Sequence, residues 1–298
     1  MNQCFDGGPI LILGANSRLA RAFMRQNCDI FSFRAIARAP CRVRQEANNF
    51  IVRDSYVDLN PELFCGCRAV INFTGVSRGD LRINVEIPVE AARTSRRMGV
   101  PHFVQISSLS VYGGIENVDL DTAENPQSAY GMSKYQADRQ LQALATDSFG
   151  VTLLRVPILY GDGGENKIHA VARLMARLGN FPVTSPQAQR SVLHLSNAAA
   201  VLRQIIQAPL FGIQLAADRE PFNFNELSAA ICAVRGAPIR LRRVPQWMLL
   251  PVALVLPNVY RSVWLSSLIK PEDSVAAQIP LPVSLQDGLR DLIERIED

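Results

Sequence analysis

Residues Pro9 to Ala20 read PILILGANSRLA, an apolar run that ends at a glycine and passes into a helical pattern. A short apolar run bounded by glycine is typical of a buried strand. The helical pattern extends from about Ser17 to Gln26. The segment therefore predicts a strand, a tight turn and a helix in succession, which is the first unit of a parallel sheet if the alternation continues.

The alternation does continue through the first half of the chain. Apolar runs predict strands, and the longer segments between them carry helical patterns. Nearly all-apolar strands that alternate with helices predict an α/β fold, with a Rossmann-like, doubly wound parallel sheet covered on both faces. The expected strands are Phe31 to Ala37, Asn49 to Val52, Ala69 to Phe73, His102 to Ile106 and Val151 to Val156, and the expected helices are Leu81 to Met98 and Tyr130 to Ser148.

The turn after the first strand lies where the pyrophosphate of a dinucleotide docks on backbone N–H groups at a helix N-terminus. The usual pattern is Gly-x-x-Gly-x-x-Gly, and here Ser17 and Ala20 replace the second and third glycines. Small residues still permit a close approach of the backbone to the ligand. The dinucleotide contacts that we expect in this turn are Gly14, Asn16, Ser17, Arg18 and Leu19.

The end of the second expected strand bears on the choice of dinucleotide. An acidic residue there would bind the adenosine ribose and favour NAD. The chain instead has Ala37 followed by Arg38, without a carboxylate. Arg38, helped by Arg18, would bind a 2′-phosphate, so we expect NADP(H), with NAD as the alternative.

Past Tyr160 the rhythm of strands and helices is irregular, and no linker rich in Gly, Ser or Pro separates an independent unit. We expect a dinucleotide-binding Rossmann domain over residues 1–160. Residues 161–298 are expected to form a smaller, mixed substrate-binding lobe, from which some segments return to the sheet. Its expected helices are Lys167 to Leu178 and Asn223 to Val234, and its expected strands are Gly212 to Ala216 and Ile239 to Val244.

Composition excludes several classes of protein. With 48% hydrophobic and 19% charged residues, the chain is a folded protein. Its net charge of +4 is mild and spread along the sequence, so we expect no nucleic-acid partner. The six cysteines and three histidines show no metal spacing, and no metal site is predicted. No signal peptide is visible, and we expect a cytoplasmic protein.

The apolar run from Trp247 to Pro257 is too short to span a bilayer and contains Pro251. We expect a buried helix with Pro251 in its first turn. Peripheral membrane contact is the alternative.

Tyr130 and Lys134 are four positions apart, and on a helix they share one face. A phenol is nearly inert as an acid or base at neutral pH. We expect the Lys134 ammonium to lower the pKa of Tyr130 toward the working range, which would make Tyr130 a general acid or base.

Three ordered motifs accompany this pair: ISSLSVYG at Ile106 to Gly113, the Tyr130 and Lys134 spacing, and LRVPILYG at Leu154 to Gly161. Together they resemble the extended short-chain dehydrogenase/reductases, the family of NAD(P)-dependent nucleotide-sugar epimerases, dehydratases and 4-keto reductases. The resemblance covers most of the chain. It implies that Ser108, Tyr130 and Lys134 are catalytic and that Asn84 completes the set. Further cofactor contacts that it implies are Phe73, Thr74, Gly75, Tyr130, Lys134 and Pro157.

The second half resembles the nucleotide-sugar branch of this family. The segment Gln189 to Asn197 looks like the one whose arginine, here Arg190, contacts the nucleotide diphosphate, and Pro280 to Leu289 resembles the closing stretch. The resemblance implies a nucleotide-sugar substrate, a role in sugar supply for surface polysaccharide, and a homodimer. Other candidate substrate contacts are Ser77, Arg78 and Asn166.

Dehydratases of the family carry an Asp-Glu pair after the catalytic hydroxyl, where this chain has Leu109 and Ser110. Reaction at C4 of the sugar then leaves two alternatives. Because of Arg38 we expect a 4-keto reductase that uses NADPH, and a 4-epimerase with tightly held NAD is the runner-up. A non-catalytic NADP-sensing protein is the alternative of a different class, although a sensor would not need Ser108, Tyr130 and Lys134.

Overall fold

The computed structural model describes residues 7–39, 49–161, 167–185, 188–255, 260 and 266–297. The chain divides into two compact units, each built from several segments. The first unit comprises residues 1–113, 123–155 and 198–215, and the second comprises 114–122, 156–197 and 216–298. Asn166, one of the predicted substrate contacts, lies outside the described residues.

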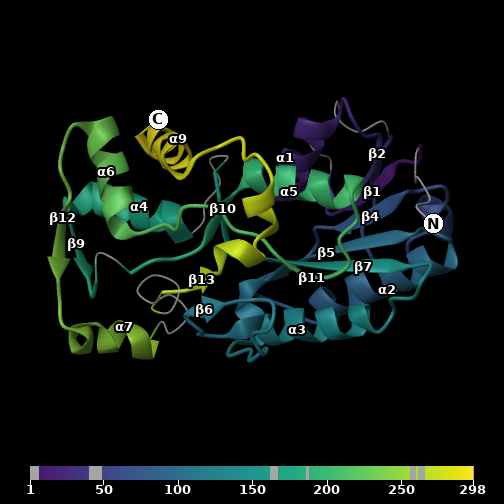
Figure 1. Ribbon diagram of the computed structural model, residues 1–298, viewed down its shortest axis with the longest axis horizontal. Helices are drawn as coiled ribbons and strands as arrows, with labels where there is room; N and C mark the ends of the chain where they lie inside the picture. The colour runs from purple at the N-terminus through teal and green to yellow at the C-terminus, as the bar shows by residue number, and fades with distance from the viewer. Residues whose placement is uncertain are drawn as a thin grey trace. The chain divides into compact units, whose positions relative to one another are not determined.

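The first unit is built on a seven-stranded sheet with the order β11-β7-β5-β4-β1-β2-β3 (Figure 1). Every pair whose register is recorded is parallel, as the apolar strands predicted. Strand order reverses between β1 and β4, and ligands of such sheets bind outside the carboxyl ends of the strands at this point. The strands are β1 (Ile10–Leu13), β2 (Phe33–Ala37), β3 (Asn49–Val52), β4 (Ala69–Asn72), β5 (His102–Ser108), β7 (Gly150–Val156) and β11 (Gly212–Leu215).

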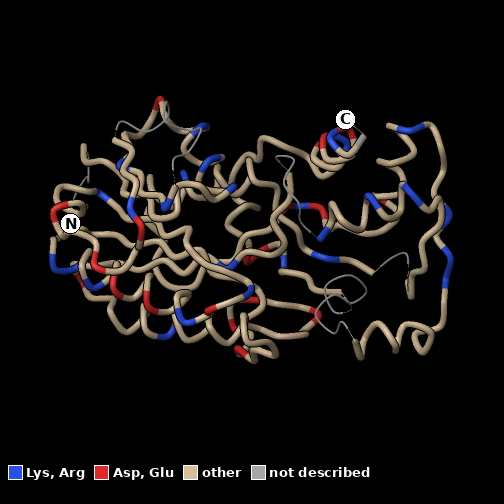
Figure 2. The backbone as a smooth tube through the Cα atoms, turned by 180° about the vertical axis from the view of Figure 1, so that it is seen from behind, with Lys and Arg blue, Asp and Glu red and all other residues tan. Residues whose placement is uncertain are grey.

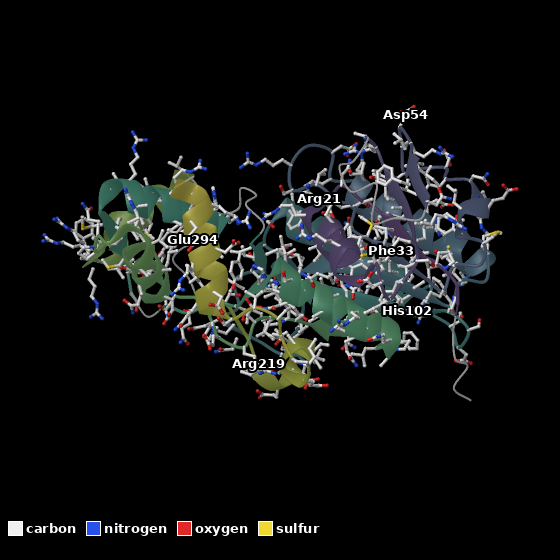
Figure 3. All side chains as sticks on the ribbon, turned by 90° about the horizontal axis from the view of Figure 1, so that it is seen from above. Arg21, Phe33, Asp54, His102, Arg219 and Glu294 are labelled. Carbon is white, nitrogen blue, oxygen red and sulfur yellow. The ribbon has the colours of Figure 1, made fainter. Side chains whose placement is uncertain are left out.

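Helices cover both faces of this sheet (Figure 1). On one face lie α2 (Ile83–Arg97) and α3 (Ala129–Gln142), and on the other lie α1 (Arg18–Asn27) and α5 (Leu195–Gln207). The four residues of β1 and the four of β4 are all buried, because a doubly covered parallel sheet has no wet face. Phe33 and His102, labelled in Figure 3, belong to strands of this unit.

The second unit packs three helices around an apolar core that includes Phe181, Val192, Leu227 and Ile293. The helices are α4 (Lys167–Leu178), α6 (Phe224–Arg235) and α9 (Leu285–Glu297). Three two-stranded parallel pairs complete the unit: β8 (Ile158–Tyr160) with β10 (Val192–His194), β9 (Asn180–Val183) with β12 (Arg240–Arg243), and β6 (Asn117–Val118) with β13 (Leu268–Ile269).

Two sequence expectations are wrong in detail. The Tyr130 helix ends at Gln142 instead of about Ser148, because Thr146 and Phe149 bond to each other in a tight turn that leads into β7. The apolar segment from Trp247 is not a buried helix. Its described part forms a short 3-10 helix (Gln246–Leu249) and α7 (Leu250–Val255), and α7 buries none of its residues.

Candidate active site

The predicted catalytic residues of the first unit meet at the carboxyl end of β5. Ser108 is the last residue of β5, and Tyr130 and Lys134 lie on the first two turns of α3. Ser108 and Tyr130 are joined by a side-chain hydrogen bond that acts to lower the pKa of the phenol. The bond brings together a strand end and a helix that twenty-odd residues separate in sequence.

Ser110 orients the hydroxyl of Ser108. The backbone N–H of Ser110 donates to Ser108 Oγ at 3.2 Å, and the Ser110 hydroxyl donates to the same oxygen at 2.8 Å. With its lone pairs engaged in this way, Ser108 has its own proton left to donate toward Tyr130. Ser110 occupies the position where a dehydratase would carry an acid, and here it supports the hydroxyl of Ser108.

Gly131 permits the close approach of α3 to this segment. A Cβ on residue 131 would collide with the carbonyl oxygen of Ser110. Ser128 caps the helix, since its hydroxyl accepts from Gly131 N at 3.0 Å. The phenol of Tyr130 is therefore placed beside Ser108 by a small residue and a cap, neither of which belongs to the Tyr-x-x-x-Lys spacing itself.

Lys134 is almost fully buried, with 4% of its surface exposed. Its Nζ donates to the carbonyl oxygen of Ile106 at 3.1 Å. Burial disfavours the ammonium and lowers the pKa of Lys134 to about 8, and the Asp138 carboxylate opposes this shift. Lys134 thus titrates close to physiological pH.

The expected lowering of the Tyr130 pKa is wrong for this structure. Burial of the phenol raises the pKa of Tyr130, while the hydrogen bond from Ser108 lowers it less and the Asp138 charge adds to the rise. Lys134 makes no contribution to this shift, and its ammonium bonds to the main chain instead. The neutral phenol is therefore the stable form, and it is ready to donate a proton.

Asn84 ties the loop after β4 to α3. Its side-chain oxygen accepts from Val76 N at 2.8 Å, and its amide donates to Val76 O at 2.8 Å and to Ser133 Oγ at 3.0 Å. Ser133 in turn donates to the carbonyl of Tyr130 at 2.8 Å. Because these bonds use its polar atoms, Asn84 is a positioning residue for the loop and helix.

A buried ion cluster lies behind the site, and the sequence reasoning missed it. Arg155 has only 1% of its side chain exposed, and it donates to Asp138 at 3.0 Å, to Tyr112 at 2.7 Å and to Glu124 at 2.9 Å. Asp138 also accepts from the Ser107 hydroxyl at 2.9 Å. A lone arginine within the apolar strand Val151 to Val156 was the available signal, since a buried charge needs a partner.

The predicted dinucleotide turn has the required local form. Ser17 caps α1 through a bond from Ala20 N to its hydroxyl at 3.1 Å, and Leu19 is buried beneath the turn. Gly14 has φ of 84°, and a Cβ there would lie 3.0 Å from Phe73 C and from Thr74 N. The backbone of the turn thus lies directly against the end of β4, in a cradle that a side chain would fill.

The remaining predicted contacts of the first unit are more exposed. Asn16 donates to the carbonyl of Ala39 at 3.0 Å, which links the turn to the end of β2. Arg38 is exposed, and its guanidinium carbon lies 5.8 Å from the centre of the Tyr56 ring. Ser77 and Arg78 are exposed in the loop after β4. No acidic residue stands at the end of β2.

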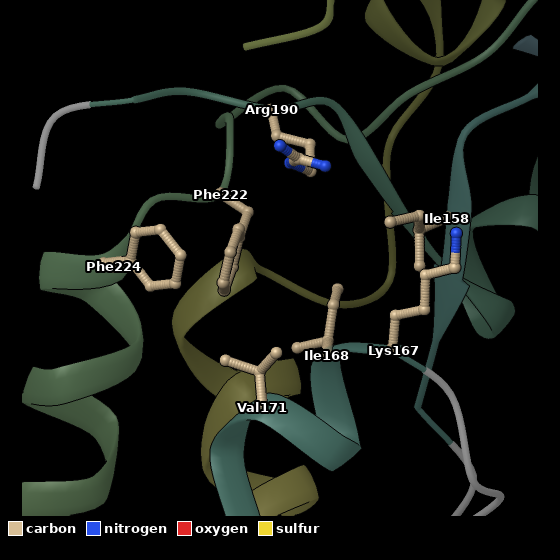
Figure 4. Close-up of a pocket in the computed structure, with 7 residues that line it drawn as sticks. All are labelled: Ile158, Lys167, Ile168, Val171, Arg190, Phe222 and Phe224. Carbon is tan, nitrogen blue, oxygen red and sulfur yellow. The ribbon is translucent and has the colours of Figure 1, made fainter. Parts of the chain in front are cut away.

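Arg190 and Pro157 belong to the second unit. Arg190 has 7% of its surface exposed and lines a narrow pocket of about 20 Å³ together with Lys167, Phe222 and Phe224 (Figure 4). Burial lowers the pKa of Arg190 to about 10. Burial also lowers the pKa of Lys167, and repulsion from Arg190 lowers it further. Two cations that repel each other in one pocket favour an anion between them.

Comparison with known proteins identifies the family of the chain. The family model described as "NAD dependent epimerase/dehydratase family" matches residues 10–214. Over 173 residues the chain is 29% identical to a UDP-glucose 4-epimerase of Vibrio cholerae, covering 55% of this chain and 53% of that protein. Over 166 residues it is 26% identical to a ceramide reductase of Caulobacter vibrioides, covering 55% and 47%. The chain spans about half the length of the curated relatives that it matches.

Solved structures share the fold over almost the whole chain. MoeE5 in complex with UDP-glucose and NAD has a TM-score of 0.77 at 19% identity, covering 97% of this chain and 99% of that one. The UDP-Glc/GlcNAc 4-epimerase of Campylobacter jejuni has a TM-score of 0.77 at 15% identity, covering 98% and 99%. At such identity the likeness concerns the fold. Because the family model matches most of the sequence, the chain belongs to the NAD-dependent epimerase/dehydratase family.

Proposed function

We propose that this protein is an NAD(P)-dependent oxidoreductase that acts at C4 of a nucleotide-diphosphate sugar, as a 4-keto reductase. The observation that carries the proposal is the joined set of Ser108, Tyr130 and Lys134 at the carboxyl end of β5. A protonated phenol with a hydroxyl bonded to it is suited to protonate an oxygen that gains charge during reduction of a carbonyl.

NAD(P)H would supply the hydride when bound. Gly14, Ser17 and the N-terminus of α1 would hold its pyrophosphate, because the turn leaves room for close backbone approach. Tyr130 would give its proton to the C4 oxygen. Ser108 would donate a hydrogen bond to the same oxygen, and the Lys134 ammonium would donate a hydrogen bond to the nicotinamide ribose of the bound cofactor.

We propose that the first unit binds the dinucleotide and that the second binds the sugar nucleotide. Support comes from Arg190, which is buried, and the exposed Lys167, two cations that repel each other beside Phe222 and Phe224 (Figure 4). A diphosphate would relieve this repulsion, because its charge is opposite to that of both side chains. MoeE5 has been solved with UDP-glucose, which agrees with a sugar nucleotide as the substrate class.

The choice of NADP(H) rests on Arg38 and on the missing carboxylate at the end of β2. A 2′-phosphate would pair with the exposed guanidinium, whereas NAD would lack its usual acidic partner. Arg38→Ala should raise the KM for NADPH and leave the KM for NADH unchanged. Equal effects on the two cofactors would contradict the NADP(H) assignment.

A second candidate is 4-epimerisation, which the similarity to the Vibrio cholerae UDP-glucose 4-epimerase favours. The test offers the purified protein a UDP-4-keto-6-deoxy sugar with NADPH, and in parallel UDP-glucose without added cofactor. Oxidation of NADPH, followed as the loss of the reduced nicotinamide absorbance at about 340 nm, supports the reductase. Formation of UDP-galactose, with NAD retained through purification, supports the epimerase.

Tyr130→Phe separates both enzymes from a non-catalytic sensor. We expect turnover to fall by about 10²–10⁴-fold while dinucleotide binding persists, because only the transferred proton is removed. If the wild-type protein binds NADPH but turns over neither substrate, the proposal is wrong.

A further inference from the structure

One exposed segment of the second unit combines positive charge with apolar side chains. We call Arg240–Val255 the basic-apolar segment; it comprises β12, the 3-10 helix and α7. Arg240, Arg242 and Arg243 are all exposed in β12. Beyond them, Trp247 is 67%, Leu254 81% and Val255 77% exposed. Met248 and Leu250 are also exposed, at 49% and 53%.

This concentration of exposed apolar side chains is unusual. Scattered single apolar residues on a surface are normal, but contiguous ones indicate a binding surface. Only Leu249 of the 3-10 helix is buried, and it fixes the segment to the unit. Figure 1 shows the chain passing from β12 to α7 at one edge of the second unit, and the 3-10 helix lies between them.

The charge of the segment defines the partner. No Asp or Glu occurs between Glu226 and Glu272, although the chain has 27 acidic residues in total. Within the described part of the chain, the side chains of Arg240, Arg242 and Arg243 form no ion pair with a carboxylate. Figure 2 shows this basic strand leading into a helical stretch that carries no charged residue. The partner that matches is anionic and apolar at once.

A bilayer surface with anionic phospholipids has both properties. Arginines attract its phosphates, tryptophan prefers the headgroup level, and leucine and valine enter the acyl region. Among the described residues, no helix is long and apolar enough to cross a membrane. Contact would therefore be made from one side, with α7 lying in the interface.

We propose that the basic-apolar segment docks the protein on an anionic phospholipid surface, with the three arginines on the phosphates and Trp247, Leu254 and Val255 inserted. The proposal rests on the exposure and charge of this segment and is independent of the chemistry at Tyr130. The sequence left two interpretations of the apolar run from Trp247, a buried helix and peripheral membrane contact. The proposal adopts the second.

Sedimentation with vesicles tests the docking. The full chain should bind vesicles of phosphatidylcholine with phosphatidylglycerol and not vesicles of phosphatidylcholine alone, and added salt should weaken the binding. The chain has two tryptophans, Trp247 and Trp264, so the Trp264→Phe variant reports on Trp247 alone. Its fluorescence should shift to the blue when anionic vesicles are added.

Two variants and two matched controls locate the contact. Arg240→Gln/Arg242→Gln/Arg243→Gln should weaken binding at least about tenfold, since each arginine contributes near an anionic surface. The control removes the same charge from exposed positions of α2, as Arg93→Gln/Arg96→Gln/Arg97→Gln, and should bind as the wild type does.

Leu254→Ser/Val255→Ser should lose binding as well. Its control is Leu174→Ser/Leu178→Ser, which changes two leucines of α4 that are 46% and 51% exposed in the same unit. Circular dichroism checks that every variant is folded. The proposal is overturned if the wild type does not bind anionic vesicles or if variants and controls bind them equally well. It is also overturned if sedimentation velocity without vesicles shows that the segment mediates self-association instead.

Discussion

Gly75 lies against the ammonium group of Lys134: a Cβ on residue 75 would stand 3.2 Å from Lys134 Nζ and 3.2 Å from Asn84 Oδ1. Gly75 also has φ of 148°, a conformation that side chains rarely adopt. The loop after β4 therefore lies directly against the side chain of Lys134. The placement of Lys134 Nζ depends on a residue that lies outside the Tyr-x-x-x-Lys spacing.

Gly75→Ala should lower kcat by at least about tenfold, because the added methyl pushes on the Lys134 ammonium and small misplacements at a reacting centre cost that much or more. Gly79→Ala is the matched control. Gly79 lies in the same loop and also has a positive φ, 84°, but a Cβ there would meet nothing within 4 Å. Steady-state kinetics of both variants decide the matter. Equal losses would show that loop strain, and not contact with Lys134, causes the effect.

Lys134→Met should remove activity and yet stabilise the fold at neutral pH. The pKa of Lys134 falls from 10.5 to about 8 on folding. Below pH 8 the folded state therefore carries a buried charge at a penalty of up to about 3 kcal/mol. Ile106 O also accepts from Gln105 Nε2, so the methionine leaves it with a partner.

The pH dependence follows from the sign of that shift. Between about pH 8 and 10.5 the folded protein has released a proton that the unfolded chain still binds, so this contribution makes the wild type more stable as pH rises. The advantage of Lys134→Met should accordingly shrink across this window in urea unfolding. In the wild type, kcat/KM should fall as pH rises through about 8, since the ammonium is the working form. A methionine variant that is less stable than the wild type at pH 7 would contradict this account.

The sequence alone was sufficient to predict the parallel sheet, and it named the residues that the structure brings together at the end of β5. Short apolar runs predicted the strands, because the strands of a parallel sheet are buried on both faces and are therefore apolar in sequence. Ser108, Tyr130 and Lys134 could be proposed as a set because their spacing is local and the motifs occur in order. The structure adds what holds them, such as Gly131 against Ser110 and Asn84 against Ser133.

The features that could not be predicted are contacts between residues that are distant in the sequence. Tyr112, Glu124 and Asp138 come from three segments, and only the fold shows that all of them bond to Arg155. The exposure of α7 was missed for a related reason. Apolar content usually predicts burial, but whether a helix finds a surface to pack on is a tertiary property.

Asn84→Ala should reduce kcat without changing the KM for the dinucleotide, because Asn84 acts through Ser133 and the Val76 backbone and not on a ligand. Loss of its bonds leaves the backbone of Val76 and the start of α3 less fixed. We expect a loss of stability of about 1–3 kcal/mol as well. Asn84→Asp keeps the acceptor for Val76 N and should retain more stability than the alanine variant. Unfolding and kinetics are measured on both, and a KM effect alone would instead indicate a direct ligand contact.

Arg155→Met should destabilise the protein by about 3–5 kcal/mol, because it leaves the carboxylate of Asp138 buried without its cation. Burial already raises the pKa of Asp138 while Arg155 lowers it, so the variant should take up a proton there and suffer less at acidic pH.

The control for this cluster is Arg295→Met, which breaks a half-exposed pair with Asp291 and should change stability by no more than about 0.5 kcal/mol. The double variant Arg155→Met/Asp138→Asn removes the orphaned charge and should recover part of the loss, which a double-mutant cycle in urea measures. If the loss of unfolding free energy in the double variant equals the sum of the losses in the two single variants, the ion pair is not what connects α3 to β7. Packing of the arginine side chain then accounts for the loss.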